Sequence, residues 1–215
     1  MTIFTIRPAK TEYNDAERLV AFFNSQVDFL PTIGSTDQWT EYVDATRAKR
    51  VHEWVTNSEL HECREFNGQY TRAFIAEVKI SAENDSAEMV KLARPDEATQ
   101  SLWLPVAGLV LEGKSPEYVR SILPEQDDHR PFIYLSYLIS DQRTNKLAKG
   151  AGSALIAHAR EQVKKAGLDR LCVDCYAGNN KKLTKYYESQ GFALIGDFKV
   201  EEKNFWPGSV LEMLS

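Results

Sequence analysis

The stretch Leu147-Ala148-Lys149-Gly150-Ala151-Gly152-Ser153-Ala154-Leu155 joins an apolar run at 132–139, through a short polar loop, to a segment with helical periodicity that ends at Gly167. Two glycines at a strand-to-helix turn let the backbone come close to a ligand. The first N–H groups of the helix that follows have no partner inside the helix and point toward that ligand. The stretch is therefore typical of a turn that binds a phosphate or pyrophosphate.

The composition indicates an ordinary globular protein. The chain has 215 residues, 43% of them hydrophobic and 27% charged, which suits one α/β domain over 1–215. A net charge of −5 gives no basic footprint for nucleic acid. The N-terminal MTIFTIRPAK lacks the apolar core of a signal peptide, and no apolar run reaches the roughly 18 residues of a membrane span. An odd number of cysteines favours a reducing, cytoplasmic compartment.

Two of the cysteines, Cys172 and Cys175, form a C-x-x-C motif inside an apolar run that is typical of a buried strand. Residues three apart on a strand face opposite sides of the sheet, so the two thiols cannot share one metal ion. The sequence also has no second Cys or His pair that would complete a zinc site. We therefore expect no metal.

Periodicity and turn residues predict the order of the elements. We expect strands at 2–6, 70–80, 102–111, 132–139, 171–176, 192–200 and 209–214, and helices at 11–27, from Ser35 to Val55, at 150–166 and at 180–190. Ser35 and Gln38 have the spacing of a capping box for the second helix. Residues 81–100 are polar and indicate a loop, and Pro105 predicts an edge position or a bulge in its strand.

Three kinds of phosphate-binding site are candidates for the opening stretch. A P-loop requires a lysine after its last glycine, whereas Lys149 precedes the first one here. A dinucleotide fingerprint requires a third glycine where Leu155 stands, and little chain follows to build such a domain. The third candidate is an acyl-coenzyme A site, in which the pyrophosphate rests on the helix N-terminus and the pantetheine runs beside the preceding strand.

The next strand and helix favour the third candidate. They read VDCYAGNN at 173–180 and LTKYYESQGF at 183–192. These segments resemble the GNAT superfamily of acetyl-coenzyme A-dependent N-acetyltransferases, in which an asparagine opens the helix and an L/Y-Y-E-x-x-G-F segment closes it. Asn180 and Tyr187 have the family's spacing of seven residues, and 147–152 aligns with its pyrophosphate loop, Q/R-x-x-G-x-G/A.

The resemblance extends by motif over 132–192 and by element order alone over 3–111. It implies an α/β GNAT fold: a mixed, mostly antiparallel central sheet flanked by helices, with splayed strands that form the acetyl-coenzyme A cleft. The single domain would then have an acceptor-side half at 1–111 and an acetyl-coenzyme A-binding core at 132–192. The residues that the resemblance assigns to acetyl-coenzyme A are Leu138, Ile139, Leu147, Ala148, Lys149, Gly150, Ala151, Gly152, Ser153, Asn180 and Tyr187.

The sequence departs from the family pattern at Leu147, where the pyrophosphate loop has Gln or Arg. Arg143, Lys146 or Lys149 can supply the missing charge instead. Because the main contacts to a pyrophosphate come from backbone N–H groups, the departure should weaken coenzyme binding rather than abolish it.

Tyr187 is the residue to which the resemblance assigns the role of general acid. A phenol with a reference pKa of about 10 is protonated at neutral pH and can donate its proton to the departing coenzyme A thiolate. Taken without the family, the position of Tyr187 favours a core aromatic at helical spacing from Leu183. Asn180 likewise has two explanations, a helix cap or a coenzyme contact.

The acceptor amine arrives mostly as an ammonium ion, so the reaction requires a base. Asp174 is the first candidate, because it lies in an otherwise apolar strand beside the expected cleft. Burying a carboxylate costs free energy, so its presence there indicates a function or a hydrogen-bond partner. A hydrogen bond to backbone or to a neighbouring tyrosine is the alternative explanation of Asp174. Glu112, at the end of its strand, is a second candidate base that could act through water.

We therefore expect an enzyme that transfers the acetyl group of acetyl-coenzyme A, as co-substrate, to a primary amine by direct attack in a ternary complex. A small-molecule amine is the expected acceptor, without nucleic acid or membrane as partner, and the protein is expected to be a monomer or homodimer. A protein or peptide N-acetyltransferase is one alternative. A non-catalytic regulatory module that binds coenzyme A is the other.

Overall fold

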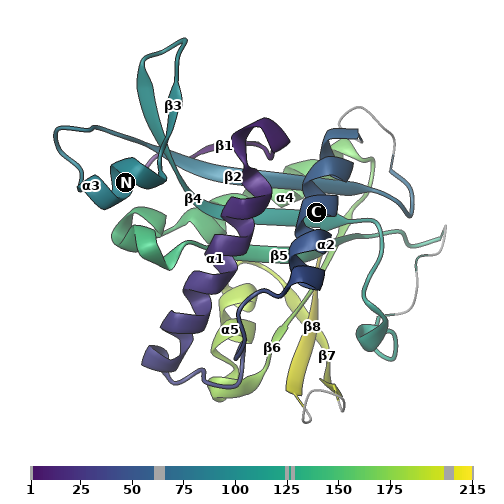
Figure 1. Cartoon of the computed structure of the whole chain (residues 1–215). Coiled ribbons are helices and arrows are strands. Elements are labelled where there is room, and N and C mark those ends of the chain that lie inside the picture. The colour runs from purple at the N-terminus through teal and green to yellow at the C-terminus, as the bar shows by residue number, and fades with distance from the viewer. Residues whose placement is uncertain (1, 61–65, 124–125, 127–128, 201–205, 215) are drawn as a thin grey trace.

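The protein is built on one mixed β-sheet. The computed structural model describes residues 2–60, 66–123, 126, 129–200 and 206–214 (Figure 1). The strands lie in the order β1 (Thr5–Pro8), β2 (Thr71–Ile80), β4 (Ser101–Glu112), β5 (Ile133–Ser140), β6 (Arg170–Tyr176), β8 (Trp206–Leu214) and β7 (Ala193–Val200), and β3 (Arg94–Asp96) pairs with the start of β4. β5 and β6 pair in parallel and the other neighbours pair antiparallel. The predicted mixed, mostly antiparallel sheet is confirmed.

Helices cover both faces of this sheet. The helices are α1 (Asp15–Phe29), α2 (Ala45–Leu60), α3 (Ala87–Leu92), α4 (Ala151–Lys165) and α5 (Gly178–Ser189). In Figure 1, α1 and α2 cross one face of β2, β4 and β5, and α4 lies behind the sheet. The alternation of side chains along β2 separates the two cores: Ala73 and Ile75 pack with α1 and α2, and Phe74 and Ala76 pack with α4. The sheet is thus buried on both sides where the two halves of the chain meet.

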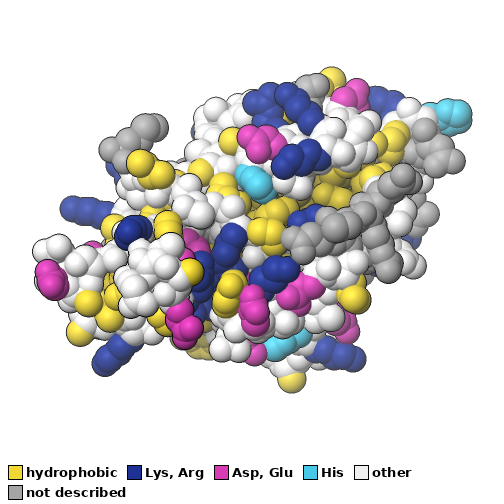
Figure 2. All heavy atoms as spheres, turned by 90° about the horizontal axis from the view of Figure 1, so that it is seen from above, with side chains coloured by type: hydrophobic (Ala, Val, Ile, Leu, Met, Phe, Trp, Pro, Cys, Tyr) yellow, Lys and Arg dark blue, Asp and Glu magenta, His cyan; other side chains and the backbone are white. Residues whose placement is uncertain are grey.

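Positive and negative side chains are interspersed on the face that Figure 2 shows from above, rather than gathered by sign. Among the residues that the structure describes, no helix combines the length and the apolar character that crossing a membrane requires.

The predicted second helix begins ten residues later than expected, at Ala45 instead of Ser35. The capping box is wrong, because Ser35 Oγ instead accepts a hydrogen bond from Asn179 Nδ2 at 2.6 Å. Local spacing predicted the cap, but a contact across 144 positions of the chain uses the hydroxyl. Residues 35–44 form an irregular connection between α1 and α2.

The segment 81–100, expected to be a loop, contains the short helix α3 and the strand β3. Ser86 caps α3, with its Oγ accepting a hydrogen bond from the backbone N–H of Met89 at 3.3 Å. β3 then pairs with β4 over Ser101–Trp103. The prediction missed both elements because their stability comes from the cap and from pairing rather than from an apolar stripe.

Pro105 lies at a bulge, as predicted, although β4 is an interior strand. The register of β2 and β4 shifts at Ala76 and Glu77, where Pro105 and Ala107 face consecutive residues of β2. On its other side, β4 pairs with β3 up to Trp103 and with β5 from Ala107 onward. Pro105 therefore falls between two pairing partners, where its missing N–H costs no ladder hydrogen bond.

A buried ion network joins β1, α1, β2 and β3. Arg7 contacts Asp15 at 2.5 Å and Glu77 at 2.8 Å, and Arg94 contacts the other oxygen of Glu77 at 2.8 Å. Both carboxylates are fully buried. Burial alone would raise the pKa of Glu77, but hydrogen bonds from Arg94 and Arg7 outweigh it and hold this pKa below its ordinary value.

Replacing Glu77 by Gln should destabilise the protein by about 3–5 kcal/mol at pH 7, because it leaves two arginines without their shared buried carboxylate. The lowered folded pKa means that the contribution of Glu77 is complete above its unfolded pKa of about 4.3 and is lost as pH falls through the folded value. The difference in unfolding free energy between wild type and Glu77→Gln should therefore shrink in acid.

Urea denaturation at pH 7 and at several values below about pH 4 measures this difference. Glu83→Gln, at an exposed carboxylate, is the control and should change stability by less than about 0.5 kcal/mol. A difference that grew toward acid would contradict the assignment.

Candidate active site

The sheet opens between β5 and β6. The two strands pair only where Ile133–Leu135 faces Leu171–Val173, and beyond these residues they separate. One extra residue on β5, Ser136, interrupts the pairing of β5 with β4 at the point of separation. A bulge bends the strand that contains it, so this one directs the end of β5 away from β6. The splayed strands that the sequence predicted are present.

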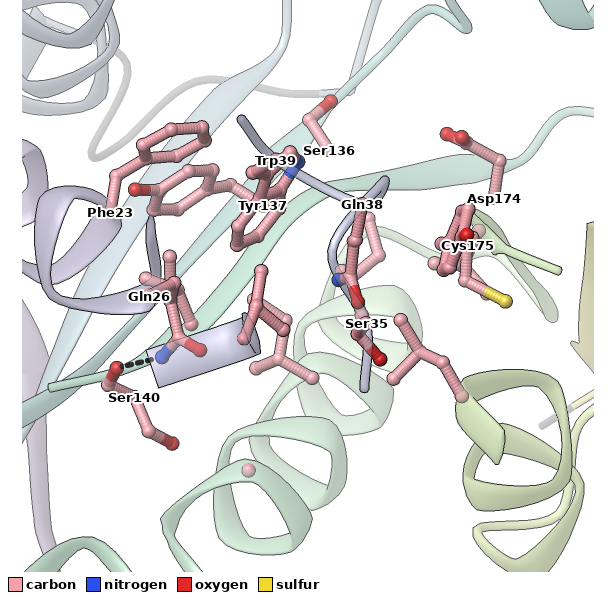
Figure 3. A pocket seen from close by; sticks show the side chains of 18 of the residues that line it. Phe23, Gln26, Ser35, Gln38, Trp39, Ser136, Tyr137, Ser140, Asp174 and Cys175 are labelled. Carbon is pink, nitrogen blue, oxygen red and sulfur yellow. Dashed lines mark hydrogen bonds between the residues drawn. The ribbon is translucent and has the colours of Figure 1, made fainter. Parts of the chain in front are cut away.

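A cavity of about 560 Å³ lies at this opening. One wall is aromatic: Phe23 of α1 and Trp39 of the α1–α2 connection lie with ring centroids 4.5 Å apart, and Trp54 of α2 and Tyr137 of β5 lie 5.5 Å apart. Figure 3 shows Phe23, Trp39 and Tyr137 together, with Asp174 on the opposite side of the cavity. The other wall comes from β5, β6, α4 and α5, with Leu138, Ile139, Gly152, Asp174, Asn179, Leu183, Tyr186 and Tyr187.

The predicted pyrophosphate turn forms the N-terminus of α4. Gly150 has φ +94°, a left-handed conformation that favours glycine, and the helix starts at the next residue. A Cβ on Gly152 would lie 2.7 Å from the hydroxyl of Tyr186. Gly152 therefore leaves room for that phenol beside the N-terminus of α4. Of the predicted loop residues at 147–153, Gly152 alone lines the cavity.

Leu147 packs against the hydrophobic core and Ala148 is buried, so the chain turns an apolar side chain inward where the GNAT pattern has Gln or Arg. Leu147 and Lys149 also border a second, more open hollow beside the cavity. Ala151 is buried, and Ser153 forms a side-chain hydrogen bond with Tyr186.

The three cations named as substitutes for the missing side chain differ in their availability. Arg143 donates to both oxygens of Asp141 at 2.8 Å, and Asp141 is buried. This bidentate pair holds the Arg143 side chain in place. Lys146 and Lys149 are exposed and form no ion pair with any residue in the described ranges. The charge near the turn is thus available from the two lysines.

Asn179, rather than the predicted Asn180, lines the cavity. Asn179 Nδ2 donates to Ser35 Oγ at 2.6 Å and to the carbonyl of Ile33 at 3.2 Å. Asn180 is exposed, and the helix cap position belongs to Ala177, so the capping explanation of Asn180 is wrong. Residues 179–181 all have left-handed φ values of 50–57°, a conformation that costs L-residues about 1–2 kcal/mol each.

Tyr187 is both a packed aromatic and a cavity residue. Its side chain is buried against Phe192 and Tyr186, with ring centroids 5.4 and 5.6 Å away. Its ring also lines the cavity, and its hydroxyl makes no hydrogen bond with the side chains or backbone of the described residues. Burial raises the pKa of Tyr187 well above its ordinary value, so the phenol stays protonated at neutral pH.

Asp174 lines the cavity from β6 and accepts hydrogen bonds from two tyrosines. The hydroxyl of Tyr134 donates to Asp174 Oδ1, and the hydroxyl of Tyr118 lies 3.3 Å from the same oxygen. Burial and the adjacent carboxylate raise the pKa of both phenols, so both remain donors. The tyrosine contact that was the alternative explanation for Asp174 is therefore present, and the carboxylate also faces the cavity.

Glu112, the second candidate base, does not line the cavity. It is buried at the end of β4 beside Tyr134 and lies 3.5 Å from Arg50 Nη2. Tyr118 and Tyr134 were missed by the sequence analysis. The signal for Tyr134 was its position in an apolar strand, because a buried phenol requires a hydrogen-bond partner. Tyr118 carried no such signal.

The two cysteines of the C-x-x-C motif pack in different cores, as predicted. Cys175 packs with Tyr187 in the core beneath α4, and Cys172 packs with Phe132 and Tyr134 on the other side of the sheet. Burial raises the pKa of each thiol to about 12. Among the described residues, no group of three or more His, Cys, Asp or Glu is arranged to hold a metal ion.

The comparisons with known proteins find relatives by structure. No family model matches the sequence, and no curated protein matches it. The chain is similar to a GNAT-family acetyltransferase from Listeria monocytogenes, with a TM-score of 0.58 and 15% identity over 99% of this chain and 95% of that one. It is also similar to a ribosomal-protein-alanine N-acetyltransferase from Brucella melitensis, with a TM-score of 0.56 and 15% identity over 98% and 99% of the chains.

A third similar structure is the NatC complex bound to Gag peptide and CoA, with a TM-score of 0.52 and 12% identity over 99% of this chain and 98% of that one. The likeness spans the whole chain in each case, including the sheet that opens between β5 and β6. At these identities the likeness establishes architecture. The chain has the fold of the GNAT acetyltransferases.

Proposed function

We propose that the protein is an acetyl-coenzyme A-dependent N-acetyltransferase that acts on a primary amine. The observation that carries this proposal is the cavity between the splayed strands, which both Asp174 and Tyr187 line. A proton acceptor and a protonated phenol in one cavity are the two groups that aminolysis of a thioester uses.

Acetyl-coenzyme A fits the opening on three counts. Beyond Leu135, the edge of β5 that faces β6 has no strand partner in the described sheet, so its backbone groups can bond the pantetheine amides. Gly152, in the first turn of α4, lines the cavity, so the unpaired N–H groups of that turn can bond a pyrophosphate. The N–H of Leu138 or Ile139 lies at the cavity, where it can bond the thioester carbonyl and the oxyanion that forms from it.

The reaction then requires two proton transfers. Asp174 removes a proton from the ammonium form of the acceptor, and the free amine attacks the thioester carbon. The carbon–sulfur bond breaks as the new amide forms, and Tyr187 protonates the departing thiolate. The hydroxyls of Tyr134 and Tyr118 hold the Asp174 side chain in position for the first step.

The connection between α1 and α2 supports a small-molecule acceptor. It crosses the cavity and is tied on its far side, where Asn179 binds Ser35 and Trp206 Nε1 donates to the carbonyl of Gln38 at 3.2 Å. Figure 3 shows Ser35 and Gln38 in this position. These two hydrogen bonds attach the connection to α5 and β8, and a cavity wall held in this way suits a compact acceptor better than an extended peptide.

A thiol-release assay with acetyl-coenzyme A and a panel of small amines and peptides tests the proposal, with mass spectrometry of the product. We expect thiol release that depends on a small amine. Tyr187→Phe should lower turnover about 100-fold or more while coenzyme binding is retained, because only the transferable proton is removed. Tyr70→Phe, at a buried tyrosine outside the cavity, is the matched control. Coenzyme binding without thiol release on any acceptor would instead favour a regulatory module.

Asp174→Asn should lower kcat/KM for the amine about 100-fold or more, because the amide cannot accept the proton of the ammonium ion. Glu112→Gln should cost less than about tenfold, because Glu112 lies outside the cavity lining. Initial rates across the pH range measure both variants. A larger loss for Glu112→Gln would make Glu112 the base.

Lys149→Gln should weaken coenzyme A binding roughly two- to fivefold, the effect of one exposed charge near a helix N-terminus. Binding of pantetheine, which has no phosphate, should be unchanged. Titration calorimetry with both ligands makes the comparison, and Lys164→Gln, at the opposite end of α4, is the control. Equal losses for coenzyme A and pantetheine would argue against a phosphate contact.

A further inference from the structure

Two arginines of α2 project onto the aromatic wall of the cavity. Arg47 and Arg50 are one helical turn apart and both line the cavity. The guanidinium carbon of Arg47 lies 5.7 Å from the ring centroid of Phe23, and that of Arg50 lies 5.0 Å from the ring centroid of Trp54. Stacking on a ring face holds a guanidinium flat and leaves its edge N–H groups directed outward. Both cations are therefore held at the cavity wall.

Most N–H groups of these two guanidiniums are available to donate hydrogen bonds to a ligand. Each one has five N–H groups. Arg50 makes one long contact, 3.5 Å to Glu112, and the guanidinium of Arg47 forms no ion pair with the residues that the structure describes. In a chain of net charge −5, two cations on one cavity wall are a local feature that favours an anionic group.

Arg50 and Asp174, a positive and a negative group of the cavity lining, are linked by a short series of contacts. Arg50 lies 3.5 Å from Glu112, which faces Tyr134 in the pairing of β4 with β5. The hydroxyl of Tyr134 in turn donates to Asp174. One short molecule can therefore place an ammonium group at Asp174 and an anion at Arg50. The rings of Phe23, Trp39, Trp54 and Tyr137 pack against one another and give the cavity an apolar surface, against which an uncharged side chain can lie.

We propose that the acceptor is a free α-amino acid with a large apolar, preferably aromatic, side chain. The charges of such a zwitterion are complementary to those of the cavity lining. Its ammonium group would lie at Asp174 and its carboxylate at Arg47 and Arg50. Its side chain would lie against the aromatic rings. This inference rests on the proposed N-acetyl transfer, and it adds that the carboxylate next to the amine is a recognition element. A peptide N-terminus has no carboxylate at that position.

Matched acceptors test the carboxylate directly. Phenylalanine, phenylalaninamide and phenethylamine share the ring and the amine, and only the first has a carboxylate. We expect kcat/KM to be on the order of tenfold to a hundredfold higher for phenylalanine than for either neutral amine, the effect of charge-assisted hydrogen bonds. Alanine, which lacks the ring, should be a poorer acceptor than phenylalanine. Equal or better transfer to the neutral amines would overturn the inference and leave the proposed function intact.

Variants assign the effect to the two arginines. Arg47→Gln should raise KM for phenylalanine about tenfold and leave the KM for phenethylamine unchanged, and Arg50→Lys should retain part of the preference because it keeps the charge. Lys49→Gln is the control on the same helix: Lys49 is exposed, pairs with Glu53 at 3.9 Å and does not line the cavity. A KM increase shared by both acceptors would indicate a structural role and contradict carboxylate recognition.

A binding measurement separates this inference from the proposed function. Calorimetry compares N-acetylphenylalanine with its uncharged amide on the protein loaded with coenzyme A, and it needs no turnover. Tighter binding of the acid, lost in Arg47→Gln, would support the carboxylate site even if no thiol were released. Equal binding of the acid and the amide would overturn it.

Discussion

The short parallel pairing of β5 and β6 is the constraint on which the rest of the structure depends. Three residues of each strand hold the two halves of the sheet together, and the bulge at Ser136 then separates them. A sheet edge in a protein interior must have its backbone groups satisfied, so an opening of this kind needs a ligand or solvent to complete it. The turn at Gly150, the aromatic wall and Asp174 are all arranged around that opening.

The buried carboxylates have different environments, and the environment of each one determines whether it stabilises the fold or can take part in a reaction. Glu77 and Asp15 are buried between arginines at the far edge of the sheet, where their charge is neutralised within the network. Asp174 instead accepts hydrogen bonds from two phenols and lies beside a cavity. A carboxylate with that environment can attract and deprotonate an ammonium ion.

Most strands and the turn before α4 were predictable because their signals are local. Alternating or continuous apolar runs placed β2, β4, β5 and β6, and the glycine turn placed the start of α4. The failures depend on contacts between distant segments. Ser35 is used by Asn179 instead of a helix, Tyr118 and Tyr134 meet Asp174 only in the folded chain, and Asn179 takes the place expected for Asn180. Local residue spacing cannot predict contacts of this kind between distant segments.

The tie between Ser35 and Asn179 has a mechanical consequence. Asn179 lies in the left-handed segment at the start of α5, the helix that contains Tyr187, and Ser35 lies in the α1–α2 connection that lines the cavity. Any movement that widens the cavity on that side pulls on the start of α5. The hydrogen bond therefore couples the width of the cavity at Ser35 to the position of the helix that contains Tyr187, so a ligand that widens the cavity there should also shift that helix.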